Sequence, residues 1–186
     1  MAAGGMPELD GGAARAELVR RWLAAFGPAP QSDLKWWTGL GVRELKAAIA
    51  AVGAVEVGIG ADEPGLVLPD DVDPVEAPEP WAALLPGLDP TPMGWHQRDW
   101  YLGPDLAAAI VDRTGNIGPT VWWDGRIVGG WAQRRDGEIV HRLLADVGAE
   151  GEAAVADAVA ALARRIGPVR VTPRFPAPLD RELVAS

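Results

Sequence analysis

The sequence predicts an α+β protein, because its helical and β-rich stretches follow one another as separate blocks along the chain. Three stretches with helical periodicity come first, followed by a short alternating stretch with a Gly/Asp/Pro turn. A Trp-rich region with two Asp-Gly turns comes next, and six of the nine tryptophans lie between Trp81 and Trp131. Together these observations predict a winged helix followed by a small antiparallel β-barrel with a C-terminal helix.

The first structural unit is expected over residues 13–69, after a disordered tail at residues 1–12. Its first helix has an apolar face formed by Val19, Trp22, Leu23 and Phe26. Gly27-Pro28 ends this helix, because glycine adopts the left-handed conformation and proline cannot continue a helix. Ser32 is the expected N-cap of a short second helix that runs through Trp36-Trp37.

A third helix and a β-hairpin complete this unit. The turn Gly39-Leu40-Gly41 precedes the helix, which Gly53 ends. Its expected apolar stripe is Val42, Leu45, Ile49 and Val52. Residues 55–59 and 66–68 predict two strands. Three helices followed by a hairpin is the order of a winged helix, although a helical hairpin on a β-ribbon with no DNA role would show the same order.

An acidic, proline-rich linker is expected over residues 70–80. Together with Pro69 these residues carry four prolines. They also carry five acids and no base: Asp70, Asp71, Asp73, Glu76 and Glu79. This composition is typical of a linker or of an exposed edge segment.

A Trp-rich, β-barrel-like domain is expected over residues 81–186. The turns at Asp124-Gly125 and Asp136-Gly137 separate three consecutive antiparallel strands. Gly129-Gly130 lies inside the second of these strands and indicates a bulge or a sharp bend, which small barrels need.

Three further elements are expected in this domain. A short helix is predicted over residues 106–112. A longer helix is predicted over residues 150–166, with acids in its first turn and bases in its last, as the helix dipole favours. Residues 169–172 could close the sheet as a last strand.

The tryptophans have two opposed explanations, as core side chains or as stacking platforms for planar ligands. Burial removes on the order of 200 Å² of each side chain from water, which contributes roughly 5 kcal/mol gross. Stacking on a base contributes about 1–3 kcal/mol. A small β unit needs the larger contribution, so most tryptophans are expected in the core. The best exposed candidate is in the pair Trp122–Trp123, because adjacent strand residues point to opposite faces.

The composition excludes several classes of protein. There is no cysteine, which excludes disulfides, thiol nucleophiles and thiolate metal sites and suits a cytoplasmic location. No segment approaches the roughly 18 consecutive apolar residues of a membrane span, and the N-terminus has no secretory signal, so no membrane partner is expected.

The net charge of −9 argues against a general electrostatic grip on DNA. The charge is uneven, however, because residues 61–80 hold seven of the 26 acids and no base. The remaining 19 acids face 17 bases, which leaves −2. A local basic face is therefore compatible with the composition.

The sequence predicts no catalytic residue, metal site or cofactor. His96 and His141 lie far apart and have no partner at motif spacing, so a structural or surface role is expected for each. No Gly-rich phosphate loop follows a strand, and no Gly-x-Ser-x-Gly elbow is present.

Seven basic residues are the candidates for contacts with DNA phosphates. They are Lys35, Arg43, Lys46, Arg98, Arg126, Arg134 and Arg135. The first three lie on the predicted helix-turn-helix, and the others lie on or before the predicted hairpins. Glu44 interrupts the first group, and Ala47 and Ala48 offer no group that reads base edges. An ordinary solvated surface is the alternative explanation.

Several motifs occur in the order of a known family. They are Asp33-Leu-Lys-Trp36-Trp37-Thr-Gly39-Leu, Leu84-Leu85-Pro-Gly-Leu-Asp89-Pro-Thr-Pro-Met-Gly, Arg98-Asp-Trp100-Tyr101-Leu, Gly115-Asn-Ile-Gly118-Pro-Thr-Val-Trp and Gly129-Gly-Trp131-Ala-Gln. These motifs closely resemble the winged-helix DNA-binding proteins of the AlkZ-like DNA glycosylase family, over roughly residues 15–180. The resemblance implies tandem winged helices and a small β-barrel that grip damaged or crosslinked DNA, with excision of alkylated bases as the activity.

One departure from the family concerns its catalytic glutamine motif, which is a Gln, an apolar residue, and a Gln or an acid in an N-terminal winged helix. Gln31 and Gln133 match nothing of this kind, and Gln97-Arg98-Asp99 has arginine in the middle and lies in the Trp-rich domain. The chain is therefore expected to be the C-terminal part of such a protein, as a truncated or split gene product, and no catalytic residue is carried over.

The function predicted from the sequence is that of a DNA-binding module with double-stranded, damaged DNA as its partner. One alternative is half of a split glycosylase that an N-terminal winged-helix partner chain completes. The other is a scaffold or interaction domain with no DNA role.

Overall fold

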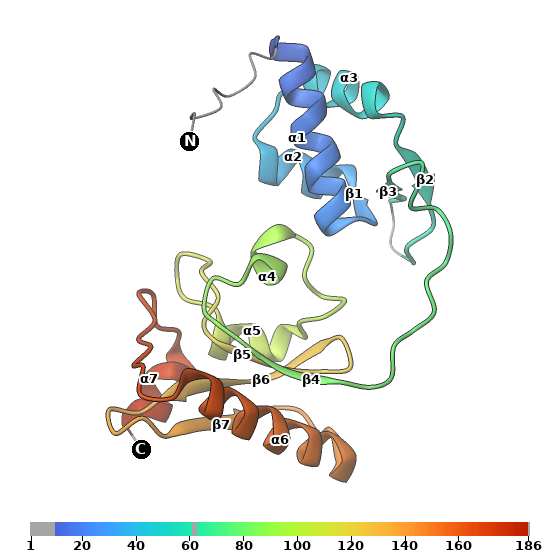
Figure 1. Cartoon of the computed structure of the whole chain (residues 1–186). Helices are drawn as coiled ribbons and strands as arrows, with labels where there is room; N and C mark the ends of the chain where they lie inside the picture. Colours follow the sequence, from blue (N-terminus) through green and yellow to red (C-terminus); the bar gives the residue numbers. More distant parts are fainter. Residues whose placement is uncertain (1–9, 61–62, 186) are drawn as a thin grey trace, which may run out of the picture. The chain divides into compact units, whose positions relative to one another are not determined.

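The computed structural model describes residues 10–60 and 63–185 (Figure 1). The chain divides into two compact units. Unit 1 comprises residues 1–75 and 94–96, and unit 2 comprises residues 76–93 and 97–186.

Unit 1 combines helices with a small antiparallel sheet. Its elements are α1 (Gly11–Phe26), β1 (Ala29–Pro30), α2 (Gln31–Thr38), α3 (Val42–Val52), β2 (Val55–Val57) and β3 (Gly65–Val67). The strands lie in the order β1-β3-β2, so β3 is central. The sequence did not predict β1, in which Ala29 pairs with Leu66 and Pro30 with Gly65.

The first helix begins earlier than expected. The side chain of Asp10 accepts hydrogen bonds from the backbone N–H groups of Gly12 (2.7 Å) and Ala13 (3.0 Å), so it caps a helix that starts at Gly11. These bonds lower the pKa of Asp10. The expected tail was therefore wrong for residues 11 and 12, and its first nine residues lie outside the described part of the chain.

Two other helix signals are corrected. Gly27 does end α1, but its backbone is extended (φ −70°) instead of left-handed. The N-cap of α2 is Pro30, and Ser32 lies inside the first turn, where its N–H donates to Glu63. By contrast, Gly39 and Gly53 end their helices in the left-handed conformation that had been expected of Gly27.

The core of unit 1 lies between α1 and α3. Val19, Trp22 and Leu23 of α1 are buried, as their spacing predicted. On α3 the buried residues are Leu45 and Ala48, while Val42 is exposed and does not belong to the stripe.

Trp95 belongs to this core, although it lies in the Trp-rich part of the sequence. Its indole Nε1 donates to the carbonyl oxygen of Phe26 at 3.1 Å. The two rings meet edge to face, with their centroids 5.2 Å apart.

Unit 2 is built on a four-stranded antiparallel sheet in the order β4-β5-β6-β7. Its strands are β4 (Ala82–Leu85), β5 (Thr120–Trp123), β6 (Arg126–Gln133) and β7 (Ile139–Leu143). Its helices are α4 (Pro90–Gly94), α5 (Pro104–Ile110), α6 (Gly148–Ile166) and α7 (Pro178–Ala185), and the last residue of α4 belongs to unit 1.

The sheet is open within the described residues, so the predicted closed barrel was wrong. Helices cover the sheet instead: α6 packs on β4 and β5, while α5 and α7 pack on β6 (Figure 1). Val155 of α6 is buried in one cluster with Val121, Val128 and Trp131. A sheet whose strands are covered in this way has no need to close on itself.

The expected irregularity in β6 is a β-bulge. Val121 pairs with Gly129 but Trp122 pairs with Ile127, so Val128 is the extra residue. A Cβ atom on Gly129 would lie 2.1 Å from the carbonyl oxygen of Arg142. Glycine is therefore required for β7 to approach β6.

Five of the nine tryptophans contribute to the cores, four of them buried and one half-buried. Trp22, Trp95, Trp122 and Trp131 are buried and Trp123 is half-buried. The pair on β5 points to both sides of a strand that is buried on both faces. Trp122 stacks on Tyr101 at 5.5 Å and donates from Nε1 to the hydroxyl of Thr120 at 2.8 Å.

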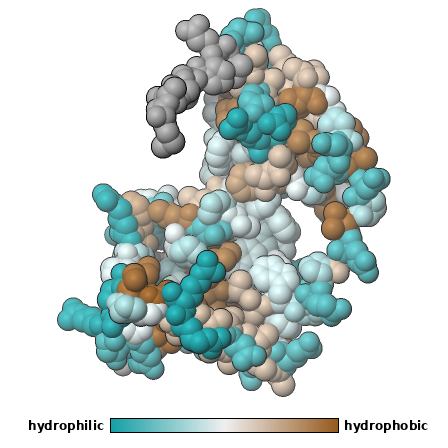
Figure 2. Space-filling model, in the orientation of Figure 1, coloured by the Kyte–Doolittle hydropathy of each residue, from teal (hydrophilic) through white to brown (hydrophobic). Residues whose placement is uncertain are grey.

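Four tryptophans remain exposed: Trp36, Trp37, Trp81 and Trp100. On the face that Figure 2 shows, apolar residues form small separate patches among hydrophilic ones. No helix in the described part of the chain is long and apolar enough to cross a membrane.

Candidate nucleic-acid interface

The three predicted bases of unit 1 lie on exposed positions of α2 and α3. Lys35 is exposed on α2, and Arg43 and Lys46 are exposed on α3. None of the three forms an ion pair within residues 10–60 and 63–185. Their charges are therefore available to an external anion.

Glu44 weakens this group less than the sequence indicated. One of its carboxylate oxygens accepts from the Gly41 N–H at 3.3 Å, which places the side chain over the start of α3. The other lies 3.4 Å from Nη1 of Arg15, which offsets part of its charge.

The four predicted bases of unit 2 do not form one cluster. Arg126 is the first residue of β6 and Arg134 directly follows its last, so the two are eight residues apart, which corresponds to about 26 Å along a strand. Arg98 is half-buried, and its carbonyl oxygen accepts from the N–H groups of Tyr101 and Leu102. The Arg-bearing hairpin therefore presents its charges at two separate places.

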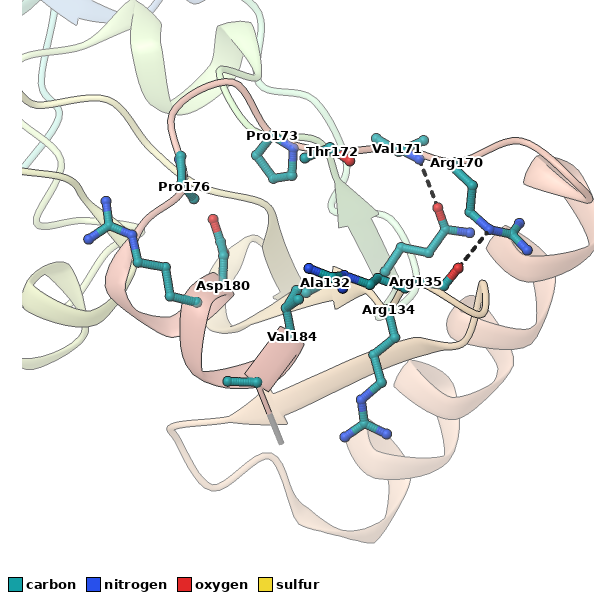
Figure 3. A pocket seen from close by; sticks show the side chains of 13 residues that line it. Ala132, Arg134, Arg135, Arg170, Val171, Thr172, Pro173, Pro176, Asp180 and Val184 are labelled. Carbon is teal, nitrogen blue, oxygen red and sulfur yellow. Dashed lines mark hydrogen bonds between the residues drawn. The ribbon is translucent and has the colours of Figure 1, made fainter.

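Basic side chains of unit 2 gather instead around a groove beside the end of β6 (Figure 3). The groove has a volume of about 880 Å³. We call it the arginine groove. Its walls are the end of β6, the segment 170–173 and α7. Four arginines and one carboxylate are among its lining residues: Arg134, Arg135, Arg170, Arg181 and Asp180.

Sequence reasoning found only half of these arginines. Arg170 and Arg181 are more than 30 residues from Arg134 and belong to no motif. No local signal in the sequence brings them together, because the groove forms only when the chain after α6 folds back along β6.

Two of the four arginines are held by the protein itself. Arg134 pairs with Glu138 at 2.7 Å and donates to the carbonyl oxygen of Leu183 at 3.4 Å. Arg170 donates to the carbonyl oxygens of Asp136 (2.8 Å) and Pro168 (3.1 Å), among others. These bonds join the wall of the groove to the turn after β6.

Gly137 makes the contact with Arg170 possible. Its φ of +103° disfavours any residue with a side chain. A Cβ atom there would also lie 2.6 Å from the guanidinium carbon of Arg170. The predicted Asp136-Gly137 turn thus has a packing role in addition to reversing the chain.

Gln133 attaches the segment that was expected to be a last strand. Its Oε1 accepts from the Val171 N–H at 2.8 Å (Figure 3). Its Nε2 donates to the carbonyl oxygens of Gly137 (3.2 Å) and Val169 (3.3 Å). Residues 169–172 are not a strand, so that prediction was wrong, and a side-chain amide replaces the backbone pairing.

Asp180 lies at the groove and is a buried residue. Oδ2 accepts from the Ala177 N–H at 2.8 Å, at the start of α7. Burial raises the pKa of Asp180 to about 6, although the Ala177 N–H and the charge of Arg181 lower it in part. The carboxylate is thus a structural group of α7 that is sensitive to pH.

Across the described residues, no group of three or more potential ligands could hold a metal ion. His96 is exposed beside Trp36, with ring centroids 5.5 Å apart, and His141 is exposed on β7. Neither histidine lies in the arginine groove.

Comparisons with known proteins identify relatives of this chain. The family profile "DNA glycosylase AlkZ-like" matches residues 3–165. The structure is similar to that of Streptomyces sahachiroi DNA glycosylase AlkZ, with a TM-score of 0.75 and 27% sequence identity. The match covers 92% of this chain and 47% of that one, so the chain spans about half of that relative's length. No curated protein matches the sequence. With a family profile that covers most of its length, the chain belongs to the AlkZ-like DNA glycosylase family.

Proposed function

We propose that the chain is a DNA-binding module and that unit 1 is a winged helix. Its order of helix, strand, two helices and two strands, with the sheet order β1-β3-β2, supports this assignment. In such a unit α2 and α3 form the helix-turn-helix, α3 approaches the major groove, and the β2–β3 hairpin is the wing.

The exposed bases of α2 and α3 are the observation on which this proposal rests. Lys35, Arg43 and Lys46 carry positive charge without an internal ion pair in the described chain. Exposed Ala47 and Ala50, by contrast, offer no donor or acceptor to a base edge. The module therefore grips the DNA backbone and does not read sequence.

We propose damaged, double-stranded DNA as the partner, because the structural relative is named as a DNA glycosylase. We propose in addition that the chain corresponds to the C-terminal part of such an enzyme, in agreement with the 47% coverage. A cytoplasmic location stays a prediction from the sequence.

We propose that the chain alone has no base-excision activity. The family's motif of two glutamines, or a glutamine and an acid, around an apolar residue has no counterpart in the sequence. Gln133 in addition uses its amide for three backbone hydrogen bonds. Such an amide is not available to position a water or a nucleophile.

A duplex titration tests the DNA-binding proposal. Fluorescence anisotropy of a labelled duplex should give an affinity that falls roughly 40-fold from 50 to 200 mM salt if about three phosphates are contacted. Replacing Arg43 and Lys46 by alanine should weaken binding about tenfold at low salt and flatten the salt dependence.

The matched control replaces Arg164 and Arg165 of α6, which removes the same charge from exposed positions. An equal loss of duplex affinity in both double variants would show that binding depends on the net charge and not on the position of Arg43 and Lys46. Absence of binding at micromolar protein would overturn the proposal and favour a scaffold role.

A base-release assay on alkylated duplex DNA tests the second part. The chain alone should release no base, and release would show that it is a complete enzyme. The half-length match leaves a split glycosylase as the second candidate. In that case release should appear only when a chain with the N-terminal winged helices is added.

A further inference from the structure

Only two of the four arginines in the arginine groove, Arg134 and Arg170, are held by side-chain bonds to other described parts of the protein. Arg135 and Arg181 form no ion pair and no side-chain hydrogen bond within the described chain. Both are exposed. A guanidinium binds phosphate through two parallel N–H···O bonds, so each of these two arginines is suited to bind a phosphate.

The walls of the groove are already held in place without a ligand. Gln133 ties the segment at Val169 and Val171 to the end of β6. Arg170 ties the same segment to the turn at Arg135 and Asp136. A site that is formed in advance loses less conformational entropy on binding.

A second, smaller pocket of about 240 Å³ adjoins the groove and shares part of its wall. The shared lining residues are Ala132, Gln133, Val171, Thr172 and Pro173. The smaller pocket adds apolar side chains, among them Trp131, Leu88 and Phe175. We call it the Phe175 pocket.

Two apolar side chains of the Phe175 pocket are unusually accessible. Leu88 and Phe175 are each 41% exposed. Leu88 in addition has a φ of +61°, which is uncommon for a residue with a side chain. The guanidinium of Arg174 lies over one face of the Phe175 ring, 5.8 Å from its centre, so the opposite face is the one left for a planar ligand. An exposed aromatic ring beside arginines is a stacking surface for a planar group.

We propose that the arginine groove and the Phe175 pocket together bind an unpaired nucleotide of a DNA strand. Arg135 and Arg181 hold its flanking phosphates, and its base enters the Phe175 pocket and stacks on the ring. The bases of an intact duplex are already stacked and paired, so they do not reach such a pocket unless they are unpaired or extruded. The identity of the strand as DNA rests on the proposed function.

The test uses three labelled or competing probes: a single-stranded oligonucleotide of about ten residues, an abasic strand of equal length, and a free mononucleotide. The base-bearing strand should bind at least about tenfold more tightly than the abasic strand, because only it stacks. Replacing Arg135 and Arg181 by alanine should weaken the binding of both strands. It should also reduce by about two the slope of the logarithm of the binding constant against the logarithm of salt concentration.

Phe175→Ala should weaken binding of the base-bearing strand about tenfold and leave binding of the abasic strand unchanged. Phe175→Tyr should retain the affinity for the base-bearing strand. A mononucleotide that competes as well as the strand would overturn the assignment to a strand. Equal binding of the two strands, or normal binding by Phe175→Ala, would overturn the proposal itself.

The duplex titration separates this proposal from the proposed function. If the duplex binds through Arg43 and Lys46 but the groove variants bind single strands normally, only the groove proposal fails. If single strands depend on Arg135, Arg181 and Phe175 while no duplex binds, only the winged-helix proposal fails.

Discussion

Asp180 shows how one buried side chain can link folding to pH. The residue is 2% exposed, and its carboxylate accepts the Ala177 N–H at the start of α7. Gly118 makes room for it, because a Cβ atom there would lie 2.8 Å from Oδ2. The protein thus keeps an ionisable group in a place where its charged form is poorly solvated.

The sign of the effect follows from the raised pKa, which goes from an ordinary 3.8 to about 6. The folded state favours the protonated form, so this contribution to stability is complete below about pH 4 and is lost as pH rises through 6. A shift of roughly two units corresponds to at most about 3 kcal/mol.

Asp180→Asn should remove this dependence, because the amide oxygen can still accept the Ala177 N–H. Between pH 4 and pH 7, the native protein should lose up to about 3 kcal/mol of unfolding free energy relative to the variant. Urea unfolding at a series of pH values measures this difference. Parallel pH profiles for the two proteins would contradict the assigned pKa.

The side chain of Gln133 holds a neighbouring segment of chain to the end of β6. As the last residue of β6 it lies at the edge of regular pairing, and its side chain takes over where the ladder ends. The sequence of residues 169–172 alternates as a strand would, but alternation does not tell whether a free partner strand is available.

Gln133→Leu should release the segment around Val171 while keeping a similar volume. Hydrogen exchange of the Val171 amide should become about tenfold faster, because a hydrogen bond that protects it is lost. Gln133→Glu is the matched control, since it keeps the acceptor for this amide and loses only the two donors. Unchanged exchange in the leucine variant would show that the segment is held by other contacts.

The helices of unit 2 explain why the predicted barrel is an open sheet. The Trp-rich strands predicted antiparallel pairing and a bulge, both of which occur. The barrel was expected because Gly129-Gly130 indicated a sharp bend inside a strand and because the family resemblance implied a small barrel. The helices α6 and α7, together with α5, cover the sheet instead, and their docking faces depend on contacts that are distant in sequence.

Charge is distributed unevenly in the molecule as a whole. The net charge is −9, and the exposed stretch 70–79 carries five acids. Long-range repulsion from these acids opposes the approach of a polyanion, while exposed bases elsewhere favour it. The acidic stretch is therefore expected to lower the rate and strength of DNA association.

Replacing these five acids by their amides, which changes the net charge from −9 to −4, should tighten duplex binding several-fold at low salt. The gain should shrink above about 0.3 M salt, where exposed charges are screened. The control replaces exposed Val72 and Val75 by serine, which alters the same stretch without changing charge. Stopped-flow association rates at several salt concentrations measure the effect, and a gain that is independent of salt would contradict an electrostatic cause.

The sequence by itself determined the elements whose signals are local. Periodicity located the first and third helices of unit 1 and the long helix of unit 2, and Asp-Gly pairs located the turns on both sides of β6. These features depend on residues a few positions apart, so a single stretch of chain contains the whole signal. The motifs likewise indicated the family to which the chain belongs.

Only the tertiary structure decided the open sheet, the short strand β1 and the arginine groove. Arg134 and Arg135 meet Arg170 and Arg181 because α6 returns the chain along the sheet and Gln133 holds the following segment to β6. The tertiary structure also decided where the tryptophans of the Trp-rich region lie. Trp131 belongs to the core of unit 2, whereas Trp95 belongs to unit 1. Such arrangements depend on which surfaces dock, and docking is decided by packing between distant residues instead of by any local pattern.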